Sequence, residues 1–300
     1  MVYTITLNPS IDYLVSVPYY KSGVVNRATK EEIYPGGKGI NVSIVLNNLN
    51  IPNKALGFIA GFTGIEIEKQ LKEFGCSTDF VTLSQGVSRM NIKIKSTEES
   101  EINGQGPDIK EMDLKKLYSI LHAVKDGDFI VIAGSIPGTL PDNIYEEIIK
   151  NTEDKKIYVI VDASGNALKN TLKYRPFLVK PNEQELGDLF GIIIQTEEEC
   201  ICYAKKLQEF GARNVMVSRA EEGAILLTEE KDVYVQKAPI GKAINAVGAG
   251  DSMVAGFIAG YINTMNYLMA FQMAVAAGSA SAFSNWLPSK QEVLQLLPKE

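Results

Sequence analysis

Predicted helices alternate with short apolar strands from residue 110 onward, and this alternation constrains the fold more than any other feature of the chain. The strands carry almost no polar residue, which is typical of strands buried on both faces of a parallel sheet. The helix and strand pairs are 110–124 with Phe129–Ala133, 142–150 with Ile157–Val161, and about 199–210 with Val215–Val217. The sequence therefore predicts an α/β fold: a doubly wound, mostly parallel central sheet with helices on both faces.

The first hundred residues predict a second, smaller sheet. Residues 88–95 alternate between apolar side chains, such as Met90 and Ile92, and cationic or amide side chains, as a strand with two different faces does. Residues 11–34 contain a proline and a glycine and favour short strands over a helix. We expect two insertions, about 11–34 and 87–105, to form a small β-sheet lid on a single domain that spans residues 1–300.

The composition excludes several classes of function. Aspartate and glutamate number 36 against 30 lysines and arginines, so the net charge of −6 disfavours nucleic acid as a partner. No apolar run is long enough to cross a membrane and the first residues do not form a signal peptide, so we expect no membrane partner and a cytoplasmic location. His122 is the only histidine, which excludes Ser-His-Asp and multi-histidine metal sites. The general base of an enzyme with this sequence is expected to be a carboxylate.

A glycine-rich segment, Asn245-Ala-Val-Gly-Ala-Gly-Asp-Ser252, runs directly into an apolar helix. Gly248 and Gly250 allow a tight turn that exposes consecutive backbone amides at the helix start, where the helix dipole favours an anion. The negative charge of Asp251 opposes an anion at this place. We interpret Asp251 as the base that deprotonates a hydroxyl attacking a phosphate held by those amides. An N-terminal helix cap is the alternative.

Polar residues also follow the first predicted strand and open the first predicted helix. Three glycines surround Lys38, and Asn41 lies one turn into the helix, which suits the close approach of a polar ligand; a plain turn is the alternative. Asp12 is placed to bind hydroxyl groups, unless it is simply solvated. Arg89 and its cationic strand face are placed to bind a phosphate, although a solvated strand face has the same pattern.

Asn182 and Glu185 form a separate candidate site, in the segment Lys180-Pro-Asn-Glu-Gln-Glu185. They stand three residues apart at a helix start and therefore face the same side. One carboxylate and one amide suit a hydrated Mg²⁺, which keeps several of its waters. A capping box uses the same residues, and for this motif alone the capping box is favoured.

Taken together and in order, these motifs resemble the ribokinase-like (PfkB) family of sugar kinases along the whole chain. The resemblance is carried by Thr6-Leu-Asn-Pro-Ser-Ile-Asp12, Pro35-Gly-Gly-Lys-Gly-Ile-Asn-Val-Ser43, Ala55-Leu-Gly-Phe-Ile59, Ile102-Asn-Gly104, Lys180-Pro-Asn-Glu183 and Val247-Gly-Ala-Gly-Asp-Ser-Met-Val-Ala-Gly-Phe257.

The resemblance implies ATP- and Mg²⁺-dependent phosphorylation of fructose 1-phosphate to fructose 1,6-bisphosphate, in a homodimer joined through the lid. The implied catalytic groups are Asp251 as base and the backbone of Gly248, Ala249 and Gly250 as an anion hole. The implied substrate-binding residues are Asp12, Gly37, Lys38, Asn41, Arg89 and Arg27, the last reaching the site from the other subunit's lid. The implied ATP-binding residues are Lys180, Asn182, Ser218, Gly223 and Gly250, and the implied Mg²⁺-binding residues are Asn182 and Glu185.

The sequence departs from the family pattern at six positions. They are Ile44 in place of arginine, Asn50 and Ala60 in place of glycine, Arg219-Ala220 in place of Leu-Gly, and Ala246 in place of threonine or serine. Ile44 bears on the predicted phosphate site, and Arg219, Ala220 and Ala246 bear on the predicted nucleotide site. Two alternatives stay open. One is a tagatose-6-phosphate kinase, which differs in where the substrate phosphate sits, and the other, kept open by the altered nucleotide loop, is a non-catalytic sugar-phosphate sensor on the same fold.

Overall fold

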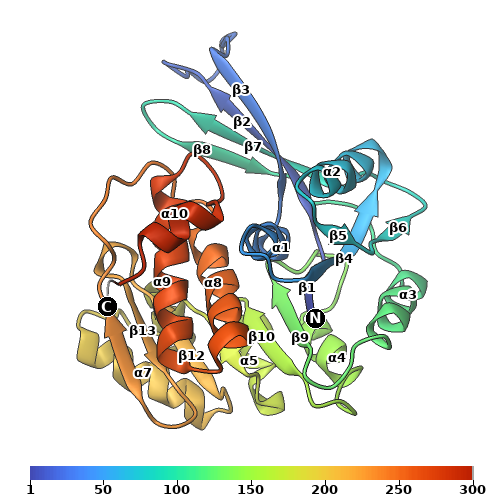
Figure 1. Ribbon diagram of the computed structural model, residues 1–300. Helices are drawn as coiled ribbons and strands as arrows, with labels where there is room; N and C mark the ends of the chain where they lie inside the picture. The colour runs from blue at the N-terminus through green and yellow to red at the C-terminus, as the bar shows by residue number, and fades with distance from the viewer. Residues whose placement is uncertain (299–300) are drawn as a thin grey trace.

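The computed structural model describes residues 1–298 (Figure 1). The strands are β1 (Val2–Thr6), β2 (Ser10–Ser16), β3 (Lys30–Gly36), β4 (Asn53–Ala60), β5 (Ser77–Thr78), β6 (Val81–Leu83), β7 (Arg89–Lys95), β8 (Ser100–Asn103), β9 (Phe129–Ala133), β10 (Tyr158–Asp162), β11 (Leu178–Val179), β12 (Asn214–Ser218), β13 (Ala224–Leu227) and β14 (Val233–Gln236). The helices are α1 (Lys38–Asn48), α2 (Gly61–Glu73), α3 (Glu111–Leu121), α4 (Ile144–Lys150), α5 (Gly165–Lys169), α6 (Glu183–Phe190), α7 (Glu197–Glu209), α8 (Ala249–Thr264), α9 (Tyr267–Phe283) and α10 (Lys290–Gln295).

The central sheet has the order β14-β13-β12-β11-β10-β9-β1-β4-β5, and β6 also pairs with β4. Every pairing from β12 to β5 is parallel, and only β13 and β14 join as an antiparallel hairpin. The chain starts in the middle of the sheet at β1, builds outward through β4, and then returns to β9 on the other side of β1. This reversal creates a switch point, where a crevice opens at the carboxyl ends of the strands. The predicted doubly wound fold is confirmed.

Alternate residues of the central strands pack into two different cores. Ile130 and Ile132 of β9 belong to the cluster covered by α3 to α7, whereas Val131 and its neighbours belong to the cluster covered by α1, α8 and α9. Both faces of the strand are therefore removed from water, which is why β9 is apolar at every position. The strands β5 and β6 were not predicted, because two or three residues are too few to show a period.

Helices α8 and α9 pack with their backbones unusually close together. A Cβ atom on Gly256 would lie 2.5 Å from the carbonyl oxygen of Met273, and one on Gly260 would lie 2.6 Å from Cα of Ala270. Glycine at these two positions of α8 therefore allows the contact, because any side chain would push the helices apart. The contact fixes α8 against α9.

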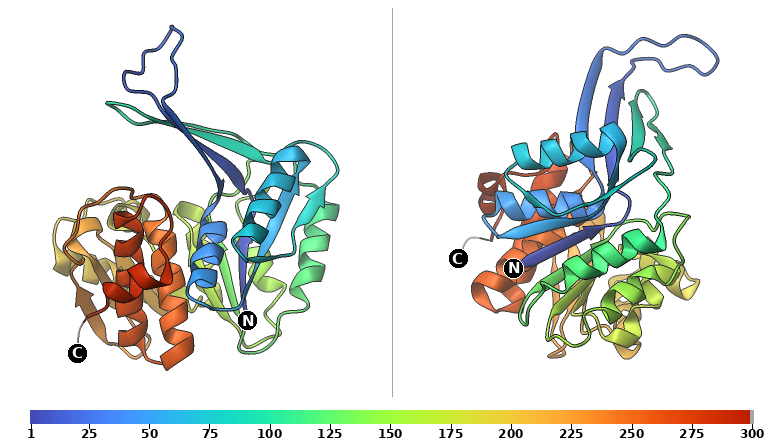
Figure 2. Two further views of the ribbon diagram at one scale, coloured as in Figure 1. Left: turned by 45° about the horizontal axis from the view of Figure 1, so that its top comes forward. Right: turned by 90° about the vertical axis from the view of Figure 1, so that its right-hand side faces the viewer.

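The second sheet has the order β3-β2-β7-β8 and projects from one end of the molecule (Figure 2). We call this sheet, with the loops that join its strands, the lid. At its base, the ring of Tyr34 stacks on Trp286 with 4.6 Å between centroids, which ties β3 to the segment before α10. The predicted small second sheet is present. Among the described helices, none combines the length and apolar character needed to cross a membrane.

Candidate active site

Five polar side chains from distant parts of the chain meet at the carboxyl ends of β1, β9, β10 and β11. They are Lys38 and Asn41 of α1, Asp162 at the end of β10, Lys180 after β11, and Asp251 in the first turn of α8. The switch point places the starts of α1 and α8 on the same side of the sheet. The crevice expected from the strand order is therefore lined with charge.

The start of α8 presents two free backbone amides. Gly248 precedes the helix with φ of 80°, a left-handed conformation that glycine adopts without strain. The amide of Ala249 donates to the carbonyl oxygen of Ala246 at 3.3 Å, and the amide of Ser252 makes the first helical hydrogen bond. Among the described residues, no backbone partner accepts from the amides of Gly250 and Asp251. These two amides, with the helix dipole, can bind an anion.

Asp251 is buried, and its carboxylate accepts a 2.7 Å hydrogen bond from the side-chain amide of Asn41. Burial raises the pKa of Asp251 to about 6, the negative charge of Asp162 adds to this effect, and Lys38 opposes it. A carboxylate with this pKa is mostly ionised at neutral pH and accepts a proton more readily than an ordinary aspartate. The group predicted as a general base thus has the environment that such a base needs.

Asp162 is a member of this cluster that sequence analysis missed. Its Oδ1 atom lies 3.1 Å from Nζ of Lys38 and 3.5 Å from Nζ of Lys180, and the side chain is buried. Burial works against the charge of Asp162, but the two lysines outweigh it and lower the pKa. An aspartate directly after the apolar strand Ile157–Val161, at the predicted carboxyl edge of the sheet, was the signal available in the sequence.

Lys180 also approaches the start of α8. A Cβ atom on Gly250 would lie 3.0 Å from Nζ of Lys180, so glycine at position 250 leaves room for this ammonium group. Lys180 is 4% exposed and has Asp162 as its carboxylate partner. The cation therefore stands beside the free amides of Gly250 and Asp251, where it adds positive charge to the anion site.

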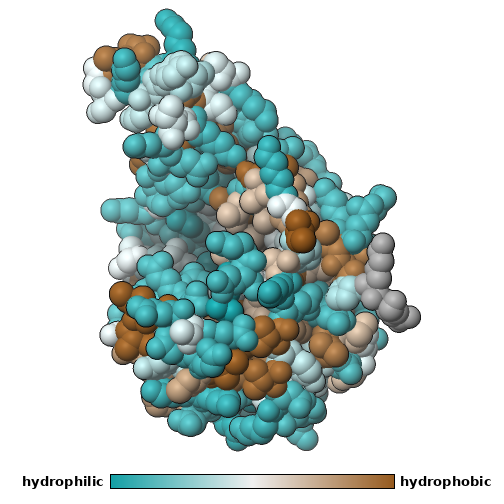
Figure 3. All heavy atoms as spheres, turned by 90° about the vertical axis from the view of Figure 1, so that its left-hand side faces the viewer, coloured by the Kyte–Doolittle hydropathy of each residue, from teal (hydrophilic) through white to brown (hydrophobic). Residues whose placement is uncertain are grey.

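A cavity of about 450 Å³ lies between the lid and the central sheet. Three of the predicted substrate-binding residues, Gly37, Lys38 and Arg89, line it. The Nε atom of Arg89 donates to the carbonyl oxygen of Asn8 at 2.9 Å, which orients the guanidinium group. Figure 3 shows a hollow bordered mainly by hydrophilic residues beneath the lid. The cavity is therefore large enough and polar enough for a phosphorylated sugar.

Asp12 lies on the inner face of the lid at the edge of an adjoining cavity that Asn41 also lines. Its Oδ1 atom accepts from the Ser10 hydroxyl at 2.7 Å and from the Asn91 amide at 2.9 Å. A Cβ atom on Gly36 would lie 2.4 Å from the same oxygen, so the strand beside Asp12 requires glycine there. The carboxylate is held in one orientation facing the site.

The predicted nucleotide-binding residues lie along the next strands of the sheet. Asn182 and Ser218 form a parallel bridge that continues the pairing of β11 and β12. Gly223, with φ of 90°, has its Cα so close to β14 that a Cβ atom would lie 2.0 Å from the carbonyl oxygen of Gln236. Lys180, Asn182, Ser218 and Gly223 are thus brought to one edge of the sheet, next to the start of α8.

Asn182 and Glu185 form the capping box that was the favoured alternative for this motif. The Asn182 side chain accepts from the Glu185 amide at 2.7 Å, and Oε2 of Glu185 accepts from the Asn182 amide at 2.8 Å. The cap leaves Oε1 of Glu185 available among the described residues. Burial lowers the pKa of Lys38, but the negative charges of Asp162, Asp251 and Glu185 together raise it. Glu185 therefore faces the charged cluster and is chemically suited to a hydrated Mg²⁺.

Comparison with known proteins identifies the family. A model of the pfkB carbohydrate kinase family matches residues 5–285. The chain belongs to the PfkB family of carbohydrate kinases. It is 46% identical to a 1-phosphofructokinase of Bacillus subtilis, with 100% of this chain and 98% of the relative covered. It is 38% identical to a D-tagatose-1-phosphate kinase of Bacillus licheniformis, with 96% and 94% covered.

A solved structure of phosphofructokinase-2 from Escherichia coli, in complex with substrates and products, superposes on this PfkB kinase with a TM-score of 0.93. The sequence identity is 26%, and 99% of this chain and 98% of the other are covered. The likeness extends over both the central sheet and the lid. The protein is therefore an enzyme with the ribokinase-like fold, as predicted.

Two departures from the family pattern have structural explanations in this kinase. Ile44 is fully buried in an apolar cluster with Ile11, Ile40 and Ile67 and does not line the cavity, which explains an apolar residue at this position. Asn50 adopts φ of 62° in the turn after α1, a conformation in which asparagine is tolerated better than most residues. The structure gives no account of Ala60 or Ala246.

Arg219 anchors the loop after β12. Its guanidinium group is 7% exposed and pairs with Glu183 at 3.0 Å, with Glu197 at 3.2 Å and with Glu222. These carboxylates come from α6, from α7 and from the loop itself. The arginine thus binds the loop to the two helices, a role that its sequence position did not indicate.

Ala220 has φ of 48°, a left-handed conformation that costs an alanine about 1–2 kcal/mol. We predict that Ala220→Gly stabilises the kinase by about 0.5–1 kcal/mol, because relief of this strain exceeds the entropy cost of glycine. Urea unfolding followed by the fluorescence of Trp286 measures the change. Ala243→Gly, at an exposed alanine without a positive φ, is the control and is expected to lower stability slightly. A loss of stability in Ala220→Gly would contradict the prediction.

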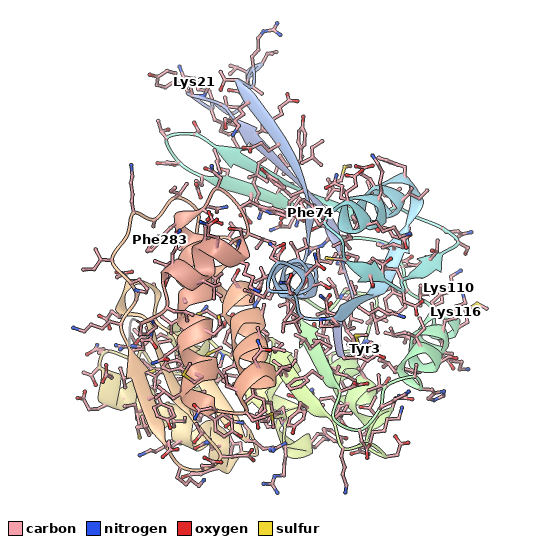
Figure 4. The ribbon with its side chains drawn as sticks, in the orientation of Figure 1. Tyr3, Lys21, Phe74, Lys110, Lys116 and Phe283 are labelled. Atoms are coloured by element: carbon pink, nitrogen blue, oxygen red, sulfur yellow. The ribbon has the colours of Figure 1, made fainter. Side chains whose placement is uncertain are left out.

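Arg27 is the one predicted substrate-binding residue that the fold does not bring to the site. It is exposed in the loop between β2 and β3 at the far end of the lid, near Lys21, which Figure 4 shows well removed from the central sheet. Within one chain, Arg27 therefore cannot contact a sugar in the cavity. Its predicted role depends on a second subunit.

Proposed function

We propose that this kinase transfers the γ-phosphoryl group of ATP to the 6-hydroxyl of fructose 1-phosphate, forming fructose 1,6-bisphosphate. The observation that carries the proposal is the placement of buried Asp251, with its raised pKa, beside two free amides at the start of α8. A base and an anion site in contact are what phosphoryl transfer to a hydroxyl requires. The Bacillus subtilis relative supports the choice of fructose 1-phosphate.

In the proposed mechanism, Asp251 takes the proton of the sugar hydroxyl as that oxygen attacks the γ-phosphorus of ATP. The bond between this phosphorus and the β,γ-bridging oxygen breaks, and ADP leaves with its electron pair. The amides of Gly250 and Asp251, with the ammonium group of Lys180, stabilise the charge on the transferred phosphoryl oxygens. Asn41 holds the Asp251 carboxylate by its 2.7 Å hydrogen bond. Asp12 orients the sugar, and Arg89 meets the phosphate that the sugar already carries.

ATP is proposed to lie along Lys180, Asn182, Ser218 and Gly223, with its γ-phosphoryl group directed at the start of α8. Glu185, held by its capping box, would bind Mg²⁺ through water. When bound, Mg²⁺ would neutralise charge on the nucleotide phosphates. The lid, which forms one wall of the sugar cavity, is proposed to exclude water from the reaction.

A tagatose 1-phosphate kinase is the second candidate, because a relative with that name is 38% identical to this chain. Tagatose and fructose differ in configuration at one carbon, and both candidate substrates carry their phosphate on C1. The same contacts to the phosphate therefore serve either substrate. Discrimination between them rests on the hydroxyl groups, for which Asp12 is the half-buried partner.

The test is release of ADP from Mg²⁺-ATP with fructose 1-phosphate, fructose 6-phosphate, tagatose 1-phosphate and tagatose 6-phosphate. The highest kcat/KM is expected with fructose 1-phosphate. A preference for either tagatose phosphate would replace the proposed substrate and leave the mechanism in place. If the folded protein turned over none of them, the proposal of catalysis would be wrong and a sugar-phosphate sensor would be favoured.

We propose further that the kinase is a homodimer joined through the outer faces of two lids. Ile33, Tyr13, Ile92 and Ile102 form one cross-strand row over β3, β2, β7 and β8. Ile33, Ile92 and Ile102 are 50%, 37% and 59% exposed, although they are apolar. A second lid would cover this row and would bring Arg27 of the partner subunit toward the site.

Charge placed in this row is expected to separate the subunits. We predict that Ile92→Lys converts a dimer to a monomer in sedimentation velocity, because a buried unpaired lysine is costly at an apolar interface. The control is Met112→Lys, at an exposed methionine of α3 that lies outside the lid. A wild-type monomer, or a dimer that persists in Ile92→Lys, would contradict the proposal.

A further inference from the structure

Lys93 stands on the inner face of the lid and is bound to Asp12. Its Nζ atom lies 3.0 Å from Oδ2 of Asp12, and each of the two side chains is 15% exposed. Lys93 follows Arg89 by four residues on β7, so both side chains point to the same side of the strand. Among the described residues, this is the one ion pair that joins two lid strands at the cavity.

The ion pair with Lys93 engages the Asp12 oxygen that a sugar hydroxyl would use. Oδ1 of Asp12 already accepts from Ser10 and Asn91, so Oδ2 is the oxygen left to receive a sugar hydroxyl. Lys93 holds that oxygen when no sugar is present. On the proposed function, sugar binding therefore has to displace the ammonium group from Asp12, and the displaced cation must find another anion or remain half-buried without one.

The cavities on both sides of Lys93 offer such an anion a place. Lys93 lines the cavity that contains Arg89 and Lys38, and it also lines the adjoining cavity that contains Asp12 and Asn41. Its long flexible chain and three N–H donors allow the ammonium group to turn from one cavity to the other. A sugar phosphate brings a dianion into this region, and Arg89 lies on the same strand face.

Two residues on the neighbouring strands lie beside Lys93 and determine its other possible partners. Leu14 of β2 and Glu101 of β8 are its direct register partners. Leu14 offers no charge. Glu101 is exposed, lines both cavities and is a second carboxylate within the reach of Lys93. Its negative charge stabilises the ammonium group of Lys93 when no phosphate is bound, and it repels a bound phosphate.

We propose that Lys93 is a specificity-determining residue that exchanges Asp12 for the phosphate of the sugar substrate. The exchange makes the binding of a sugar hydroxyl by Asp12 depend on the presence of a phosphate. A sugar without phosphate breaks the ion pair between Lys93 and Asp12 and gives Lys93 no new anionic partner. Lys93 thereby selects phosphorylated sugars over free sugars. This inference rests on the proposed function, in which the sugar site is occupied by a sugar phosphate.

The test compares Lys93→Met with the wild type and with Lys30→Met. Lys30 is a lid lysine that is 63% exposed and paired with Glu32 on the surface, so its replacement removes the same charge away from the cavity. The dissociation constants of fructose 1-phosphate and of fructose are measured by calorimetry, and KM and kcat are measured with fructose 1-phosphate and with ATP.

Lys93→Met is expected to weaken binding of fructose 1-phosphate and raise its KM by about 10- to 100-fold, the size of one charged hydrogen bond. Fructose binding is expected to hold or to improve, because Asp12 is freed, and KM for ATP is expected to stay within about twofold. Lys93→Arg should recover much of the affinity for the phosphate, whereas Lys30→Met should behave as wild type.

Equal losses for fructose and fructose 1-phosphate in Lys93→Met would overturn the inference, because a merely structural role would produce them. Unchanged binding of fructose 1-phosphate would overturn it as well. Wild-type protein that binds fructose 1-phosphate without turning it over would refute the proposed function and leave the exchange intact. Wild-type protein that binds no sugar phosphate would refute both.

Discussion

Asp251→Asn is expected to lower kcat by about 10³-fold or more, because the variant has no base to accept the proton of the attacking hydroxyl. Asparagine keeps the size of the side chain, and its carbonyl oxygen can still accept the hydrogen bond from Asn41. KM for the sugar is therefore expected to change little. Steady-state kinetics with Mg²⁺-ATP and fructose 1-phosphate provide the measurement.

The same variant is expected to be more stable than the wild type above pH 6. The pKa of Asp251 is raised in the fold from an ordinary value of 3.8 to about 6, so its ionisation opposes folding. This cost is absent below pH 4, grows as the pH rises through 6, and is then complete at about 3 kcal/mol. Asparagine carries no such cost. Urea unfolding at pH 4 and at pH 8 should therefore show equal stabilities at pH 4 and a more stable variant at pH 8.

Asp113→Asn is the matched control for the alternative that Asp251 is only a helix cap. Asp113 is also buried and also occupies the third position of its helix, α3, where it takes part in a capping box. The control is expected to lose a little stability and no activity. If Asp251→Asn behaved in the same way, with nearly full turnover, the assignment of Asp251 as the base would be wrong.

Asp162→Asn is expected to destabilise the fold by about 3 kcal/mol at pH 7, because it leaves the buried ammonium group of Lys180 without a carboxylate. The two lysines lower the pKa of Asp162, so this carboxylate stabilises the fold above its ordinary pKa, and the contribution is lost as the pH falls. The difference between variant and wild type should therefore shrink below pH 4. Urea unfolding at pH 7 and pH 3.5 measures it.

Asp162→Asn is also expected to shift the pH profile of catalysis. In the wild type, kcat/KM should fall on the acid side with an apparent pKa of about 6, as Asp251 becomes protonated. Asp162 is the second cause of that raised pKa, after burial, so its removal should move the acid limb to lower pH. Asp79→Asn, at an exposed carboxylate 3.6 Å from Lys54, should change neither stability nor profile by much. An unmoved acid limb in Asp162→Asn would contradict the coupling.

Several parts of this protein follow from local sequence alone. The apolar strand Phe129–Ala133 is buried on both sides because two helical layers cover it, and its bounds agree with the prediction. The glycines before Asp251 were interpreted as the start of a helix, and α8 begins at Ala249. In each case the signal lies within one element, because periodicity, turn residues and helix starts are set by neighbours along the chain.

The position of Arg27 and the burial of Ile44 illustrate what the local pattern did not reveal. Arg27 was assigned to the site by family resemblance, and the fold places it at the far end of the lid. Ile44 was identified as a departure that bears on the phosphate site, and the fold buries it in an apolar core. Whether a residue faces a cavity, a core or solvent depends on which elements pack against it. The tertiary packing determines this environment, and the residue type alone does not indicate it.

The sequence by itself determined the α/β fold and the small second sheet, and it pointed to Asp251 and its glycines as the proposed base and anion site. Only the tertiary structure decided which charges act on that base. Asp162 meets Lys38 across 124 residues of chain, and Asn41 reaches Asp251 across 210. The raised pKa of Asp251 and the pairing of Lys93 with Asp12 depend on distances of a few ångströms and on burial. Both quantities exist only after the sheet has brought distant strands and helix starts to one edge, because electrostatic interactions follow separation in space and exclusion of water rather than separation in sequence.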